Sequence, residues 1–111
     1  MLTYMESNGH NYVIKFTVNA LCAYEDRFQN DIATVVTSPS VTNLRGALWA
    51  GLISEQPDTT LDDAGDIIDG YMSNDKALGD VVALILQALT DAGFFKKAGN
   101  AKNPAKKTTK K

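Results

Sequence analysis

The chain begins with two short segments in which apolar and polar residues alternate. In the second segment, 12–18, every second residue is apolar: Tyr12, Ile14, Phe16 and Val18. A period of two places these side chains on one face of a β-strand. The first segment covers 2–6, and the Asn8-Gly9 pair in the turn between them favours a tight reversal, because both residues tolerate a positive φ. The pattern predicts a β-hairpin, half-buried because its apolar face could cover a helical core. A lone two-stranded hairpin is only marginally stable in water, so its stability must come from this packing.

From Asn19 the spacing of apolar residues changes to that of a helix. Asn19 can cap a short first helix, whose apolar residues fall on neighbouring turns: Leu21, Tyr24 and Phe28. The segment 31–36 is ambiguous, since Asp31 can cap a helical turn whereas the Thr-Val-Val sequence that follows favours a strand. We interpret this segment as helical.

Two longer helices are predicted after Pro39. Ser40 can cap the first, which runs to about Ile53, because proline disfavours a helical residue before it. The segment 60–63 resembles a capping box, with a shorter acid in place of glutamate, and begins the second. The predicted core faces of the two helices are Val41, Leu44, Leu48 and Leu52, then Leu61, Ala64, Ile68 and Tyr71.

The last helix opens at 73–75 and has the most regular apolar stripe: Leu78, Val81, Val82, Ile85, Leu89 and Ala92. Gly93 can end it, with Phe94 and Phe95 folding back. The run 96–111 has no large apolar residue, so ordering it would cost entropy without burying surface. We predict an α+β, mainly α fold. It comprises one helix-rich globular domain over 1–95, with an N-terminal β-hairpin and four or five short helices, and a disordered basic C-terminal tail over 96–111.

The size and the apolar content limit the class of protein. A chain of 111 residues with 44% hydrophobic content fits one globular domain. Its longest strongly apolar stretch, 81–86, is far shorter than the roughly 18–20 residues that cross a bilayer, so no membrane association is expected. The N-terminal sequence lacks the features of a secretory signal, and the single cysteine, Cys22, cannot form an internal disulfide. These features predict a cytoplasmic location.

Charge is distributed unevenly along the chain. Residues 1–95 contain all 13 acidic residues and four basic ones, a net charge of −9, whereas the tail carries +7. The tail could bind nucleic acid by counterion release, but the acidic body would repel the same phosphates and no interleaved aromatic residues support base contacts. A flexible, solubilising or partner-reading tail is the favoured interpretation. Its basic residues are Lys96, Lys97, Lys102, Lys106, Lys107, Lys110 and Lys111.

The residues that could support catalysis or metal binding are few. His10 is the only histidine and falls in the predicted turn, so the chain has no Ser-His-Asp, Cys-His or multi-histidine arrangement. Cys22 lies in an apolar helical stretch and is expected to be buried and inert. Asp62, Asp66 and Asp69 lie on neighbouring turns, but their spacing does not match an EF-hand. A solvated acidic face is favoured, with docking of a basic partner as the alternative. We expect no catalytic residue, cofactor or metal.

Large apolar residues offer the remaining candidate binding site. Trp49 and the Phe94-Phe95 pair could anchor a partner, because aromatic side chains are enriched in interface hot spots. Packing in the protein's own core is the favoured explanation for them. Together with Leu52, they are the candidate partner-binding residues.

Four segments, in order, resemble the tail assembly chaperone family of long-tailed bacteriophages and gene transfer agents. The segment 12–25 (YVIKFTVNALCAYE) resembles the family's opening, in which a hairpin runs into a helix containing a glutamate. The segment 44–52 (LRGALWAGL) is similar to its Leu-Trp-Ala-Gly-Leu helix, and 57–65 (PDTTLDDAG) to the capped helix that follows. The segment 88–95 (ALTDAGFF) also resembles the family. The resemblance covers about residues 12–95.

This resemblance implies a non-enzymatic chaperone that binds the phage tape-measure protein. Such a chaperone keeps the tape-measure protein soluble in the host bacterial cytoplasm while the tail tube polymerises, and it is not expected in the mature virion. In several such phages a ribosomal frameshift yields a longer form that recruits tail-tube protein; the paired tail lysines are hypothesised frameshift sites. Homo-oligomerisation is left open. The alternatives are a generic helical protein-interaction adaptor and, less favoured, a nucleic-acid-binding protein acting through its Lys-rich tail.

Overall fold

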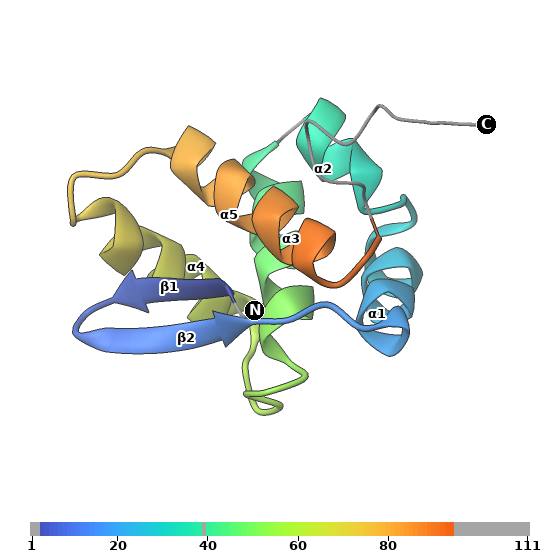
Figure 1. Cartoon of the computed structure of the whole chain (residues 1–111), viewed down its shortest axis with the longest axis horizontal. Helices are drawn as coiled ribbons and strands as arrows, with labels where there is room; N and C mark the ends of the chain where they lie inside the picture. The colour runs from blue at the N-terminus through green and yellow to red at the C-terminus, as the bar shows by residue number, and fades with distance from the viewer. Residues whose placement is uncertain (1–2, 39, 95–111) are drawn as a thin grey trace.

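The computed structural model describes residues 3–38 and 40–94 (Figure 1). In chain order its elements are β1 (Thr3–Ser7), β2 (His10–Ile14), α1 (Val18–Phe28), α2 (Ala33–Thr37), α3 (Val41–Leu52), α4 (Leu61–Met72) and α5 (Leu78–Asp91). The predicted mainly helical α+β fold with an N-terminal hairpin is therefore confirmed, including the helical interpretation of 31–36. The predicted disordered tail, 96–111, and Phe95 lie outside the described residues.

The hairpin reverses at Asn8 and Gly9, as predicted. Their φ angles are 53° and 83°, and positive φ at both central residues is what a tight type I′ turn requires. Strand β2 begins at His10, earlier than predicted, and it ends at Ile14 rather than at Val18. The prediction of the strand's end was wrong because the chain turns there into α1. Val18 is the first residue of that helix and is 66% exposed.

The ends of α1 and α5 differ from the sequence-based prediction. Thr17, rather than Asn19, caps α1, and its Oγ1 accepts a hydrogen bond from the Ala20 N–H at 3.0 Å. Helix α5 begins at Leu78 rather than at 73–75, and the Asp80 carboxylate accepts from the N–H of the residue before the helix at 2.9 Å. In both helices the cap is a local contact, as predicted, but a residue other than the predicted one supplies it.

The N-termini of α3 and α4 are built as predicted. Ser40 Oγ accepts a hydrogen bond from the Asn43 N–H at 3.1 Å and caps α3. Thr60 and Asp63 form a reciprocal capping box at α4, with hydrogen bonds of 3.0 and 3.1 Å. Asp63 thus replaces the more usual glutamate, and its shorter side chain still reaches the Thr60 N–H.

Helix α3 lies at the centre of the molecule and contacts every other described helix and β2 (Figure 1). Small residues permit these close approaches. The ring of Phe28 from α1 packs where a Cβ at Gly46 would lie, and the side chain of Ile14 would be 2.8 Å from a Cβ at Gly51. The predicted core residues of this helix, Leu44, Leu48 and Leu52, are buried. Val41, which was predicted to join them, is 64% exposed.

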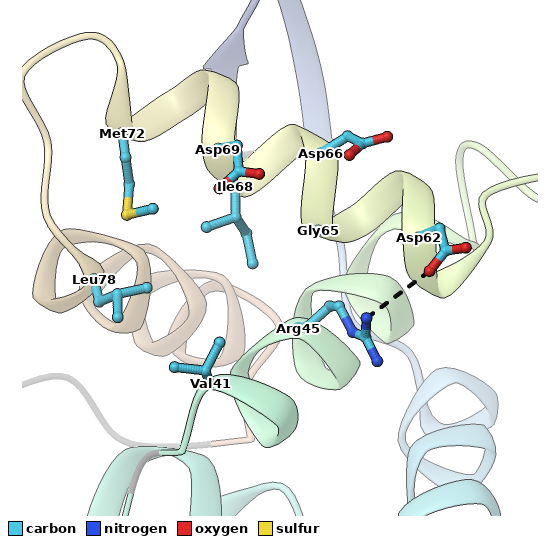
Figure 2. Close-up of a pocket in the computed structure, with 9 residues that line it drawn as sticks. All are labelled: Val41, Arg45, Asp62, Gly65, Asp66, Ile68, Asp69, Met72 and Leu78. Atoms are coloured by element: carbon cyan, nitrogen blue, oxygen red, sulfur yellow. Dashed lines mark ion pairs between the residues drawn. The ribbon is translucent and has the colours of Figure 1, made fainter.

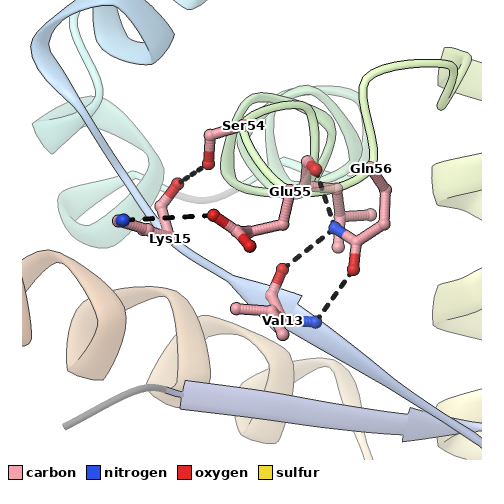
Figure 3. A network of polar contacts seen from close by, with 6 residues as sticks. Val13, Lys15, Ser54, Glu55 and Gln56 are labelled. Atoms are coloured by element: carbon pink, nitrogen blue, oxygen red, sulfur yellow. Dashed lines mark hydrogen bonds and ion pairs between the residues drawn. The ribbon is translucent and has the colours of Figure 1, made fainter.

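The loop after α3 closes the outer edge of β2 (Figure 3). The side-chain amide of Gln56 accepts from the Val13 N–H at 3.1 Å and donates to the Val13 carbonyl at 3.2 Å. It also donates to the Leu52 carbonyl at 2.7 Å. Ser54 Oγ donates to the Lys15 carbonyl at 2.9 Å. One side chain therefore pairs with β2 where a third strand would otherwise lie.

Strand β1 packs against α4 and α5. The Thr3 hydroxyl donates to the Asp91 carboxylate at 2.8 Å and so joins the hairpin to the end of the last helix. Gly93, with a φ of 91°, ends α5 as predicted, and the Phe94 N–H donates to the Leu89 carbonyl at 3.0 Å. In the part of the chain that the structure describes, no helix is both long enough and apolar enough to span a bilayer.

Candidate partner-binding groove

Trp49, the first candidate anchor, is half-buried on α3. Its indole N–H donates to the Thr59 carbonyl at 3.1 Å, and the guanidinium carbon of Arg27 lies 5.3 Å from the ring centroid. The ring packs against the core and also lines an open hollow of about 470 Å³. Trp49 therefore ties the loop after α3 to α1 and α3, while partner anchoring stays a prediction.

The other candidate anchors are placed differently. Leu52 is completely buried, so in this conformation its side chain offers no surface to a partner. Phe94 is half-buried and packs back against the core, as predicted. Phe95 and the tail lysines (Lys96, Lys97, Lys102, Lys106, Lys107, Lys110 and Lys111) lie outside the described residues.

Neither His10 nor Cys22 belongs to a constellation of reactive groups. His10 is exposed, as expected, but it begins β2 and its ring centroid lies 6.0 Å from that of Tyr12. The prediction that Cys22 is buried was wrong, because its thiol is exposed. It precedes the buried Tyr24 by two positions, about 200° around a helix, and so faces away from the core.

Asp62, Asp66 and Asp69 are all exposed on α4, as expected for a solvated acidic face. Within 3–38 and 40–94, no three His, Cys, Asp or Glu side chains are grouped so that they could hold a metal ion.

The acidic face borders a groove of about 560 Å³ between α4 and the N-terminal ends of α3 and α5 (Figure 2). Ile68 and Met72 point from α4 toward Val41 and Leu78 on the opposite side. These four residues, which we call the apolar floor, contain no aromatic side chain. Two floor residues are accessible, since Val41 is 64% and Leu78 is 37% exposed, whereas Ile68 is buried and Met72 is half-buried beneath them.

The position of two floor residues explains why the groove is open. Val41 and Leu78 are the first residues of α3 and α5, so each lies at the end of its helix. Both were predicted to face the core because helical periodicity places them on the apolar stripe. Each apolar stripe includes the first residue of its helix, but the neighbouring elements that bury the rest of the stripe do not reach that residue.

The rim of the groove is negatively charged. Asp62, Asp66 and Asp69 line it from α4, and Arg45 lines it from α3. The Arg45 guanidinium lies 3.9 Å from the Asp62 carboxylate, but the Asp62 side chain is 96% exposed and the pair contributes little to stability. Among the described residues no cation pairs with Asp66 or Asp69.

Within residues 3–38 and 40–94, the shifted pKa values belong to two tyrosines outside the groove. Burial, and to a smaller extent the charge of Asp31, raises the pKa of Tyr24 above its ordinary value. Burial, followed by the charge of Asp80, raises the pKa of Tyr71 in the same direction. Neither tyrosine lines the groove, whose chemistry is that of an apolar surface beside carboxylates.

Comparisons of the chain with protein-family models, with curated proteins and with solved structures found no match in any of the three. The groove is therefore interpreted from its own chemistry, and the resemblance to tail assembly chaperones stays a prediction.

Proposed function

We propose that the chain is a non-enzymatic tail assembly chaperone that binds the tape-measure protein of a long-tailed phage in the cytoplasm of the host bacterium. The observation that carries this proposal is the apolar floor, on which Val41 and Leu78 are exposed, beside an acidic rim. A groove of this kind suits a helix that lays its apolar face against it. The sequence resemblance over residues 12–95 supplies the identity of the partner.

The physical need for such a protein is clear. A long helical protein that exposes apolar stripes aggregates unless the stripes are covered. Many copies of a small helical protein can cover them through modest individual contacts, and the total avidity rises with the number of tandem sites. Weak single contacts also allow the chaperone to leave as the tail tube forms, so that it is absent from the mature virion. A frameshifted longer form would recruit tail-tube protein.

A helical adaptor that docks an unrelated partner is the second candidate function, because the same groove would serve it. Co-expression separates the two. We expect tape-measure protein to shift from the insoluble to the soluble fraction when this chain is co-expressed, and to co-purify with it. The matched control is co-expression of an unrelated acidic protein of similar size. Tape-measure protein that stays equally insoluble in both cases contradicts chaperoning and favours the adaptor.

A further inference from the structure

The side chains that line the groove indicate which kind of ligand it binds. In the described part of the chain, five large apolar side chains are exposed: Tyr4, Val18, Val41, Leu78 and Leu86. Two of these, Val41 and Leu78, lie 37 positions apart in the sequence and nevertheless meet in one groove. Ile68 and Met72 complete the floor, and the unbranched, polarisable methionine can adapt to varied aliphatic partners. The floor therefore fits aliphatic side chains.

The rim adds a charge pattern with a definite spacing. Asp62, Asp66 and Asp69 are related as i, i+4 and i+7 on α4, so they form a row about 10 Å long at a rise of 1.5 Å per residue. A second helix lying parallel to α4 would present basic residues to this row at the same spacing. Since Asp66 and Asp69 have no cation partner among the described residues, such a helix would meet unpaired carboxylates.

We infer that the groove binds an amphipathic helix of the partner, two to three turns long, whose aliphatic stripe lies on the floor and whose Lys or Arg residues at i, i+4 and i+7 face Asp62, Asp66 and Asp69. The identification of that helix as part of the tape-measure protein rests on the proposed function. The chemical preference of the groove for a basic amphipathic helix is argued independently of that function.

Two other occupants fit less well. The chain's own segment 96–111 is basic but has no large apolar residue to cover the floor. A second copy would bring another acidic body, of net charge −9 over residues 1–95, against the acidic rim. Charge complementarity therefore selects a basic amphipathic partner.

The probe for the test is a synthetic helical peptide with leucines on one face and lysines at i, i+4 and i+7 beside them. A matched peptide has glutamates in place of the lysines. Binding of each labelled peptide to the full chain is measured by fluorescence anisotropy at low salt. We expect the lysine peptide to bind about tenfold more tightly or better. Equal affinity for the two peptides would overturn the inference.

Two variants localise the binding. Val41→Asp places a carboxylate under the leucines of the peptide, where the cost of its desolvation outweighs its attraction to the flanking lysines, and should weaken binding of the lysine peptide by about tenfold. Val18→Asp is its matched control, since Val18 is also the first residue of a helix, is 66% exposed and lies outside the groove. Acidic residues are favourable in the first turn of a helix, so both variants should fold, which circular dichroism checks. Equal weakening by the two variants would place the binding elsewhere and overturn the inference.

Charge reversal tests the rim. The double variant Asp66→Lys, Asp69→Lys should lose the lysine peptide and gain the glutamate peptide, a reversal that simple damage to the fold cannot produce. If replacing the seven tail lysines with glutamine raises the affinity for the lysine peptide far more in the otherwise wild-type chain than in Val41→Asp, the tail occupies the groove and the inference is wrong. Self-association that Val41→Asp abolishes would contradict it in the same way.

The two proposals fail separately. If the peptide preferences hold but tape-measure protein stays insoluble on co-expression, the groove chemistry stands and the chaperone function falls. If tape-measure protein is made soluble equally by the wild-type chain and by Val41→Asp, the chaperone function stands and the groove is not its binding site.

Discussion

Glycine at position 46 determines how closely α1 approaches the central helix. The Phe28 ring occupies the space that a Cβ on Gly46 would need, and the same ring stacks against Tyr24 with centroids 4.9 Å apart. Moving the half-buried Phe28 ring would therefore disturb its contact with the buried Tyr24. The close packing of α1 against α3 therefore requires that residue 46 has no Cβ.

Gly46→Ala is expected to destabilise the protein by about 1–3 kcal/mol, because the added methyl group must displace the Phe28 ring. Urea denaturation followed by circular dichroism measures the change. Gly79→Ala is the matched control, since Gly79 is also helical but has no atom near the site of a Cβ. That control should stabilise the protein by about 0.4–1 kcal/mol. Equal effects of the two variants would mean that Phe28 does not fill the space above Gly46.

At the scale of single residues, the sequence predicted which side chains are apolar and which helix face they share. It could not predict which of them a neighbour covers. Val18, Val41 and Ala92 each fit a periodic apolar pattern, yet each is exposed at or just beyond the end of its element. Cys22 was wrongly expected in the core because the prediction rested on its apolar neighbours in sequence and not on the side of the helix that it faces.

Among the elements, the loop that follows α3 protects β2. In a hairpin of this register Val13 directs its N–H and carbonyl away from β1, and the Gln56 amide pairs with both. An unpaired strand edge invites association with other chains. A single glutamine thus does locally what a third strand does in larger sheets.

Gln56→Ala is expected to cost about 1–3 kcal/mol of stability, because it leaves the N–H and carbonyl of Val13 without their side-chain partner. Hydrogen exchange at the Val13 amide should become faster at the same time. The control is Gln87→Ala, which removes an exposed hydrogen bond to Asp91 and should change the stability by less than about 0.5 kcal/mol. Unchanged exchange at Val13 would show that Gln56 does not pair with the strand in solution.

Most elements could be predicted because their caps and periodicity are local. Ser40, Thr60 and Gly93 each act at the position that the sequence indicated. Strand β2 could not be bounded in this way, because its alternation continues to Val18 whereas tertiary packing ends it at Ile14. There the Lys15 N–H donates to the Gly51 carbonyl of α3 at 2.8 Å, a contact that no local pattern indicates.

On the scale of the whole molecule, two buried tyrosines link stability to alkaline pH. The pKa of Tyr24 and that of Tyr71 are raised above 10.0, so the folded protein keeps these protons at a pH at which the unfolded chain releases them. The free energy of unfolding should therefore fall as the pH rises above about 10, until the pH exceeds the folded pKa values.

Urea denaturation at a series of alkaline pH values measures this slope. Tyr71→Phe should make it shallower, because phenylalanine has no proton to release. Other groups that titrate in this range act equally in both proteins, so the difference between the two slopes isolates Tyr71. Identical slopes would show that the Tyr71 hydroxyl is not held neutral by the fold.

The candidate groove is a property of the whole molecule, and the sequence did not predict it. The aspartates of its acidic rim could be recognised in the sequence, because they lie on one face of a single predicted helix. Its floor could not, because Val41 and Leu78 belong to helices far apart in the chain and meet only through packing around α3. Arg45 joins the rim in the same way.

The hydrogen bond between Thr3 and Asp91 has a consequence for the order in which the protein is made. Strand β1 is synthesised before α4 and α5, two of the elements that cover it. Until Asp91 has left the exit tunnel, Met5 cannot be fully buried and the hairpin cannot pack against its final neighbours. Between the synthesis of β1 and that of α5, the nascent chain therefore carries a hairpin face that its final neighbours do not yet cover.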